Sequence, residues 1–163
     1  MKNKSIRYLA TAAMIAAIYA VLCIILAPIS YSAIQVRVAE ALTILPAFTP
    51  AAIPGLTIGC LLANILGGCV LLDIIFGTLA TLIGAVGTYL LRSHKKLIWM
   101  PPVVSNTIIV SIFSIYIPYL GESDDSLWFI MLTVCAGELL SVCVLGYLLY
   151  FALRKVNSKV KLF

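Results

Sequence analysis

Few residues in this 163-residue chain carry side chains that can do polar chemistry in an apolar environment. The candidates are ionisable or amide residues set in or beside long apolar runs: Arg37, Glu40, Asn64, Asp73, Asn106 and Glu138. An ionisable group at membrane depth is costly unless it meets a partner or a ligand. We therefore expect some of these residues to form a binding site. Glu138 is the residue that most needs a hydrogen-bonding partner or a ligand.

The spacing of polar residues matches no catalytic motif. The chain has no HExxH pair, no GxxxxGK[ST] loop for nucleotide phosphates and no nucleotide-binding glycine fingerprint. Its single histidine, His94, lies in a basic stretch, and its five cysteines form no CxxC pair. Buried free thiols behave as small apolar groups. We predict no catalytic residue, no metal site and no cofactor, so a membrane-embedded enzyme is the least favoured function.

The composition indicates what must position these residues. The chain is 63% hydrophobic and only 10% charged, whereas about 25% of residues are charged in a typical soluble domain. Its length suits one domain of roughly six crossings at about 20 residues each. The sequence therefore predicts an all-α integral membrane protein of a single domain, spanning residues 1–163.

Six helices are predicted, at residues 6–27, 38–48, 53–66, 72–91, 97–117 and 127–153. The second and third span less than about 20 Å at 1.5 Å per residue. We expect them to pack inside the bundle or to form a partly re-entrant hairpin. The apolar run near the N-terminus lacks a convincing small-residue cleavage site, so it is interpreted as an uncleaved first helix.

The basic residues indicate the orientation. All except Arg37 fall within residues 2–7, 92–96 and 154–161. With six crossings these three clusters lie on one side, which the preference of Lys and Arg for cytoplasmic loops identifies as the cytoplasm. Both termini are then cytoplasmic. No aromatic or motif structure interleaves the clusters, so nucleic acid is not an expected partner.

In this orientation the polar candidates lie between the outer surface and the midplane. This arrangement favours a cup that is open to the outside over a continuous channel. Arg37 and Glu40, three residues apart, form either a simple ion pair or part of a binding loop. Aromatic residues near the same rim belong either to an interfacial belt or to the wall of the site: Tyr31, Tyr116, Tyr119 and Trp128.

Small residues repeat every four positions on two helices. The first helix carries Ala12, Ala16 and Ala20 on one line and Ala13 and Ala17 on another. The fourth carries Gly77, Thr81, Gly84 and Thr88. Such faces allow close approach of helix backbones in lipid. They serve either internal packing, favoured for both helices and more strongly for the fourth, or docking of another membrane protein.

Four stretches closely resemble the QueT family: "QVRVAEALTILPAFTPAAIPGLTIGCLLANILGG", "DIIFGTLATLIGA", "PPVVSNTIIV" and "AGEL". The resemblance extends from about Ala10 to Gly146. QueT proteins are substrate-binding S components of energy-coupling factor (ECF) transporters, assigned to queuosine precursors. The resemblance implies a six-helix bundle in a prokaryotic plasma membrane that captures a solute outside the cell.

It also implies partners: membrane lipid, a shared T component and two ATPase subunits that hydrolyse ATP in the cytoplasm. In this superfamily an alanine-rich face of the first helix docks the T component. That face corresponds here to Ala12, Ala13, Ala16 and Ala17.

The implied ligand is a 7-deazaguanine. We assign Glu138 to its two adjacent N–H donors and Asn106 to its carbonyl. A cationic aminomethyl substituent would require Glu40 or Asp73, and Trp128 or Tyr31 would cover the ring. Arg37 and Asn64 complete the candidate substrate-binding set. Two alternatives remain: an S component for another vitamin-like solute, and a non-transporting membrane scaffold whose buried polar residues only set helix registry.

Overall fold

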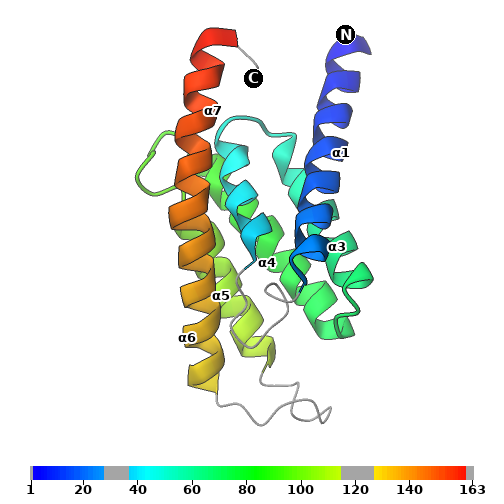
Figure 1. The fold of residues 1–163 in the computed structure, drawn as a ribbon, viewed down its shortest axis with the longest axis vertical. Helices are drawn as coiled ribbons and strands as arrows, with labels where there is room; N and C mark the ends of the chain where they lie inside the picture. The colour runs from blue at the N-terminus through cyan, green and yellow to red at the C-terminus, as the bar shows by residue number, and fades with distance from the viewer. Residues whose placement is uncertain (1, 28–36, 115–126, 161–163) are drawn as a thin grey trace.

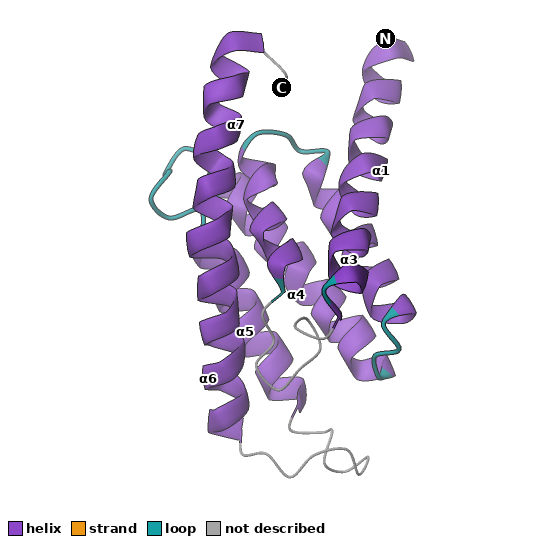
Figure 2. Cartoon of the chain, viewed as in Figure 1, coloured by secondary structure: helices purple, strands orange, loops and turns teal. Residues whose placement is uncertain are grey.

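The computed structural model describes residues 2–27, 37–114 and 127–160, which are helical and contain no strand (Figures 1 and 2). The helices are α1 Lys2–Ile25, the 3-10 helix η1 Val38–Ala47, α3 Ala52–Leu66, α4 Leu71–Leu90, α5 Met100–Ser114, α6 Leu127–Glu138, the π-helix η3 Leu139–Gly146 and α7 Tyr147–Val160. The all-helical prediction is confirmed for this part of the chain.

Three segments are long and apolar enough to cross a membrane: Lys4–Ile25, Leu71–Leu90 and Met131–Val156. Three shorter apolar helices accompany them, at Val38–Ala47, Ala52–Leu66 and Met100–Ile112. The chain is therefore treated as a membrane protein. Six complete crossings and cytoplasmic termini stay predictions, although the start of α1 and the end of α7 lie at the same end of the bundle (Figure 1).

The bundle is built around η1. This helix contacts α1, α3, α4, η3 and α7, while α1 packs on α3, α3 on α4, α4 on α5 and α5 on α6. The last three helical elements, α6, η3 and α7, run end to end as one long rod (Figure 1). Packing inside the bundle was one of the two arrangements expected for the short helices, and η1 adopts it, with most of its residues buried.

The second helix is not an α-helix as predicted but a 3-10 helix. Pro46 lies inside it, and proline removes a backbone donor that an α-helix requires. The Glu40 backbone N–H donates to the Arg37 carbonyl at 2.9 Å, and the Thr43 hydroxyl donates to the Glu40 carbonyl at 2.6 Å. Long 3-10 runs are uncommon and often mark functional positions.

Glycines allow α1 and α3 to approach closely. A Cβ on Gly59 would lie 2.8 Å from the Cβ of Tyr19 and 2.9 Å from the carbonyl oxygen of Ala16. A Cβ on Gly55 would lie 2.7 Å from the carbonyl oxygen of Ala12. This contact places the Tyr19 side chain of α1 within the hydrophobic core of the bundle.

Three predicted helix boundaries differ from the structure by more than two residues. The first helix begins at Lys2 rather than at residue 6. The fifth helix begins at Met100 rather than at residue 97, because residues 94–97 form turns and a proline pair, Pro101 and Pro102, suits a first helical turn. The last helix continues to Val160 rather than ending at residue 153. Residues 115–117 of the predicted fifth helix lie outside the described residues.

Candidate functional site

Six helical elements each contribute a polar side chain to the interior of the bundle. We call this set the buried polar cluster: Tyr19 of α1, Glu40 of η1, Asn64 of α3, Thr81 of α4, Asn106 of α5 and Glu138 of α6. Each of these residues is 5% exposed or less. Buried polar groups are stable only when hydrogen-bonded, so the partners of each side chain decide what the cluster can do.

Glu40 lies at the centre of the cluster. Its Oε1 accepts a hydrogen bond from the Tyr19 hydroxyl and a longer one, at 3.5 Å, from the Thr81 hydroxyl. Its other oxygen, Oε2, is buried and has no hydrogen-bond partner among the described residues. A buried carboxylate oxygen in this state is costly, and a donor supplied by a ligand would satisfy it.

Glu138 repeats this arrangement on the other side of the cluster. The Asn106 amide donates to its Oε1 at 3.0 Å, whereas its Oε2 is buried without a hydrogen-bond partner in the described part of the chain. Glu138 is the last residue of α6, where the helix changes from α to π geometry. Such π segments are frequent at functional sites.

The two carboxylates are close enough to interact electrostatically, and the Asn106 side chain interacts with both of them. Two like charges in a buried site repel each other, so a positive or donor-rich group between them would be stabilised. Arg37, half-buried at the start of η1, adds positive charge that acts on both carboxylates.

Asn64 connects α3 to α4. Its amide donates to the backbone carbonyl of Asp73 at 3.5 Å and to the sulfur of Cys60 at 3.6 Å. The Thr81 hydroxyl lies 3.3 Å from that sulfur and 3.1 Å from the Gly77 carbonyl of its own helix, so its single hydrogen is shared among these acceptors and Glu40. These bonds hold the two helices in register beside Glu40, so Asn64 supports the site from its edge.

Two further predicted site residues, Asp73 and Trp128, do not join this cluster. Asp73 is half-buried near the start of α4. Trp128 is 72% exposed and lies about 15 Å along the helix from Glu138 at 1.5 Å per residue. Tyr31, Tyr116 and Tyr119 lie outside the described residues.

The alanines of α1 divide between two faces. Ala12 and Ala16 are buried against α3, where their backbone meets the glycines Gly55 and Gly59. Ala13 and Ala17 are exposed. Internal packing therefore explains Ala12 and Ala16, whereas Ala13 and Ala17 remain exposed on the surface of α1. On α4, the predicted internal packing of the small-residue face is confirmed, since Gly77, Thr81, Gly84 and Thr88 are all buried.

Sequence reasoning missed two members of the cluster. Tyr19 lies in an apolar run without any distinguishing spacing, and Thr81 was interpreted only as a small packing residue. Their bonds to Glu40 join residues 21 and 41 positions apart. The one available signal was a phenol within an otherwise apolar helix, since a buried tyrosine hydroxyl usually finds a partner.

No group of three or more His, Cys, Asp or Glu side chains in the described ranges is arranged to hold a metal ion. The cluster offers carboxylate acceptors and an amide donor without a nucleophile activated by a base. Its chemistry is that of recognition: it can accept hydrogen bonds from a donor-rich or cationic group.

Comparison with known proteins assigns the chain to a family. The family model described as QueT transporter matches residues 9–155, which includes every residue of the buried polar cluster. Comparisons with curated proteins and with solved structures gave no significant match. Because the match covers most of the chain, this protein belongs to the QueT transporter family.

Proposed function

We propose that this transporter-family protein captures a queuosine precursor of the 7-deazaguanine type within the buried polar cluster. The observation that carries the proposal is the pair of buried carboxylates, Glu40 and Glu138, each with one oxygen that has no hydrogen-bond partner among the described residues. A ligand that supplies donors to both oxygens would remove the energetic penalty of burying them without a hydrogen bond.

The ligand's functional groups match the side chains of the cluster. A 7-deazaguanine presents two adjacent N–H donors beside a carbonyl acceptor, and a carboxylate such as Glu138 accepts both donors. Asn106 has two amide hydrogens, so it can keep its bond to Glu138 and donate the other hydrogen to the ligand carbonyl. Glu40 is the proposed partner of a cationic aminomethyl substituent, with the more peripheral Asp73 as the alternative.

The proposed transport role is that of an S component in the prokaryotic plasma membrane. The chain would take up its ligand from the outer side, dock on a T component and rely on two ATPase subunits for energy. Its lack of a Walker-type nucleotide motif fits this division of labour. Ala13 and Ala17 are the proposed docking residues, since they are exposed on α1, while Ala12 and Ala16 pack on α3.

The test is ligand binding by the Glu138→Gln variant. Removing the charged acceptor should weaken binding of a 7-deazaguanine by more than about tenfold, because hydrogen bonds to charged groups contribute about 1.5–3 kcal/mol. Thr78→Val is the matched control, since among the described residues the Thr78 hydroxyl bonds only its own helix, to Ile74. Calorimetric titration of the purified protein measures both variants.

Equal dissociation constants for Glu138→Gln and the unaltered protein would refute the assigned role. A screen of deazapurines and vitamins by thermal shift separates the alternatives, because a tight ligand stabilises the folded state by mass action. Stabilisation by a different vitamin alone would indicate another cargo. Absence of saturable binding by every compound would favour a scaffold role.

A further inference from the structure

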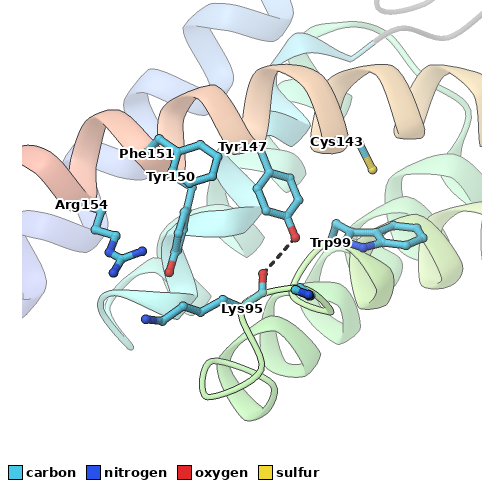
Figure 3. A pocket seen from close by; sticks show the side chains of 8 residues that line it. Lys95, Trp99, Cys143, Tyr147, Tyr150, Phe151 and Arg154 are labelled. Carbon is cyan, nitrogen blue, oxygen red and sulfur yellow. Dashed lines mark hydrogen bonds between the residues drawn. The ribbon is translucent and has the colours of Figure 1, made fainter.

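A cavity of about 410 Å³ lies between the connection 91–99 and the last helices, near the predicted cytoplasmic side (Figure 3). Its lining residues are Lys95, Lys96, Trp99, Cys143, Tyr147, Tyr150, Phe151 and Arg154. This volume is within the range of about 300–1,000 Å³ that is usual for small-molecule sites.

Tertiary contacts build the cavity. The Tyr147 hydroxyl donates to the backbone carbonyl of Lys95 at 2.9 Å, which ties the connection to the helix (Figure 3). Tyr150 packs at 5.0 Å on Phe48 and at 5.8 Å on Phe151, measured between ring centroids. The aromatic wall is therefore held from several sides.

The cavity is positively charged. Three of its eight lining residues, Lys95, Lys96 and Arg154, are basic and none is acidic. In Figure 3 the Lys95 and Arg154 side chains extend toward the hydroxyl of Tyr150. Two segments far apart in the sequence thus bring cations and a hydroxyl donor together, which are the groups that bind a phosphate oxygen.

The orientation predicted from the basic clusters would place the cavity at the depth of lipid headgroups. Its basic residues belong to two of the clusters that the preference for cytoplasmic loops places at the inner membrane surface. Exposed apolar side chains lie on the elements beside it: Val144 and Leu148 on the η3–α7 rod and Val104 and Ile108 on α5 are all more than 40% exposed. Acyl chains would be accommodated along these surfaces.

We propose that this cavity binds the phosphodiester headgroup of an anionic phospholipid from the cytoplasmic leaflet. Basic pockets between membrane helices on this side are suited to such headgroups. The phosphate lies among Lys95, Lys96 and Arg154, while Trp99 and Phe151 contact the glycerol and the upper acyl chains. Phe151 is 60% exposed. Its apolar ring could contact a lipid acyl chain but would not stabilise a soluble anion, which favours a lipid over free phosphate.

Trp99 provides a local reporter of this site. The chain has two tryptophans, so the Trp128→Phe variant retains Trp99 alone. Phosphatidylglycerol brominated near the carboxyl end of its acyl chains is titrated into the purified full-length variant in detergent. We expect saturable quenching of Trp99 fluorescence, with a half-saturating lipid concentration more than about fivefold lower than that of brominated phosphatidylcholine. Each nearby basic residue contributes about fivefold in affinity for an anionic headgroup.

The triple change Lys95→Gln, Lys96→Gln and Arg154→Gln should weaken phosphatidylglycerol binding by roughly 100-fold. The matched control removes the same charge from the N-terminal cluster through Lys2→Gln, Lys4→Gln and Arg7→Gln, and should change binding less than about twofold because this site is a local pocket. If the first triple variant does not fold, Arg154→Gln alone is expected to lose about fivefold.

Equal weakening in both triple variants would overturn the proposal, because it would indicate non-specific attraction between basic clusters and lipid. Equal quenching by the two brominated lipids would also overturn it. Relief of quenching by inorganic phosphate at concentrations equal to the lipid would identify a soluble anion rather than a headgroup as the occupant, which again contradicts the proposal.

Discussion

The hydrogen bond from Tyr19 to Glu40 can be tested by removing one oxygen atom. Tyr19 is completely buried, and its hydroxyl is the closest donor to Glu40 among the described residues, since Thr81 donates from 3.5 Å. The Tyr19→Phe substitution keeps the ring that packs in the core and deletes only this hydroxyl. The buried carboxylate then loses this donor and keeps the longer bond from Thr81 and its interaction with Asn106.

The expected loss follows from the charge of the acceptor. A hydrogen bond to a charged group contributes about 1.5–3 kcal/mol, whereas a neutral one contributes about 1 kcal/mol. Tyr19→Phe should therefore lower the free energy of unfolding by about 2 kcal/mol. At about 2–4 °C per kcal/mol for a chain near this length, Tm should fall by about 4–8 °C.

The chain itself provides the assay. Cys23 and Cys60 are buried free thiols, so a fluorogenic maleimide reports their exposure as the protein unfolds on heating. Tyr8→Phe is the control, because within the described part of the chain the Tyr8 hydroxyl makes only a long, exposed bond of 3.4 Å to the carbonyl of Pro50. Its Tm should stay within about 1 °C, since a bond this long contributes little.

A double-mutant cycle isolates the pair. In a Glu40→Gln background the acceptor is neutral, so the cost of Tyr19→Phe should fall to about 1 kcal/mol. Equal costs in the two backgrounds, or an unchanged Tm for Tyr19→Phe in the unaltered protein, would refute the argument that a buried carboxylate depends on this phenol.

Three further predictions concern packing, the cluster and docking. Gly59→Ala should reduce the free energy of unfolding by about 1–3 kcal/mol through overpacking of α1 on α3. Gly146→Ala is the control and should leave Tm nearly unchanged in the same thermal assay, because its new Cβ would lie 3.4 Å from its nearest neighbour. Asn106→Leu leaves the Oε1 of a buried carboxylate without its amide donor, so Tm should fall by at least about 4 °C; an unchanged Tm would contradict the contact. Ala13→Leu with Ala17→Leu should preserve Tm and ligand affinity but abolish uptake in cells that supply the partner subunits, and normal uptake would exclude this face from docking.

The membrane character of the protein could be predicted from composition, because no small soluble core can bury a chain that is 63% hydrophobic. Similar levels along their helices were also predicted for Glu138 and Asn106, since helical rise converts position into distance. The structure brings these two side chains into contact at 3.0 Å. Their role in substrate binding stays a prediction.

Other features depended on contacts between distant parts of the chain. The sequence left open whether the alanines of α1 pack internally or dock a partner. In the structure, Gly55 and Gly59 of α3 pack against the backbone of Ala12 and Ala16. The short second helix was identified, but its 3-10 geometry was not.

The sequence by itself determined the membrane character of this protein and the approximate positions of its helices. It also identified the polar residues that would need a partner in an apolar environment. Hydrophobicity and helical rise are properties of consecutive residues, so they can be calculated without a fold. Only the tertiary structure decided that Tyr19 and Thr81 serve Glu40, and that each buried carboxylate keeps one oxygen without a partner among the described residues. Hydrogen bonding between helices depends on how each helix is rotated and packed, and that geometry exists only after the whole bundle has formed.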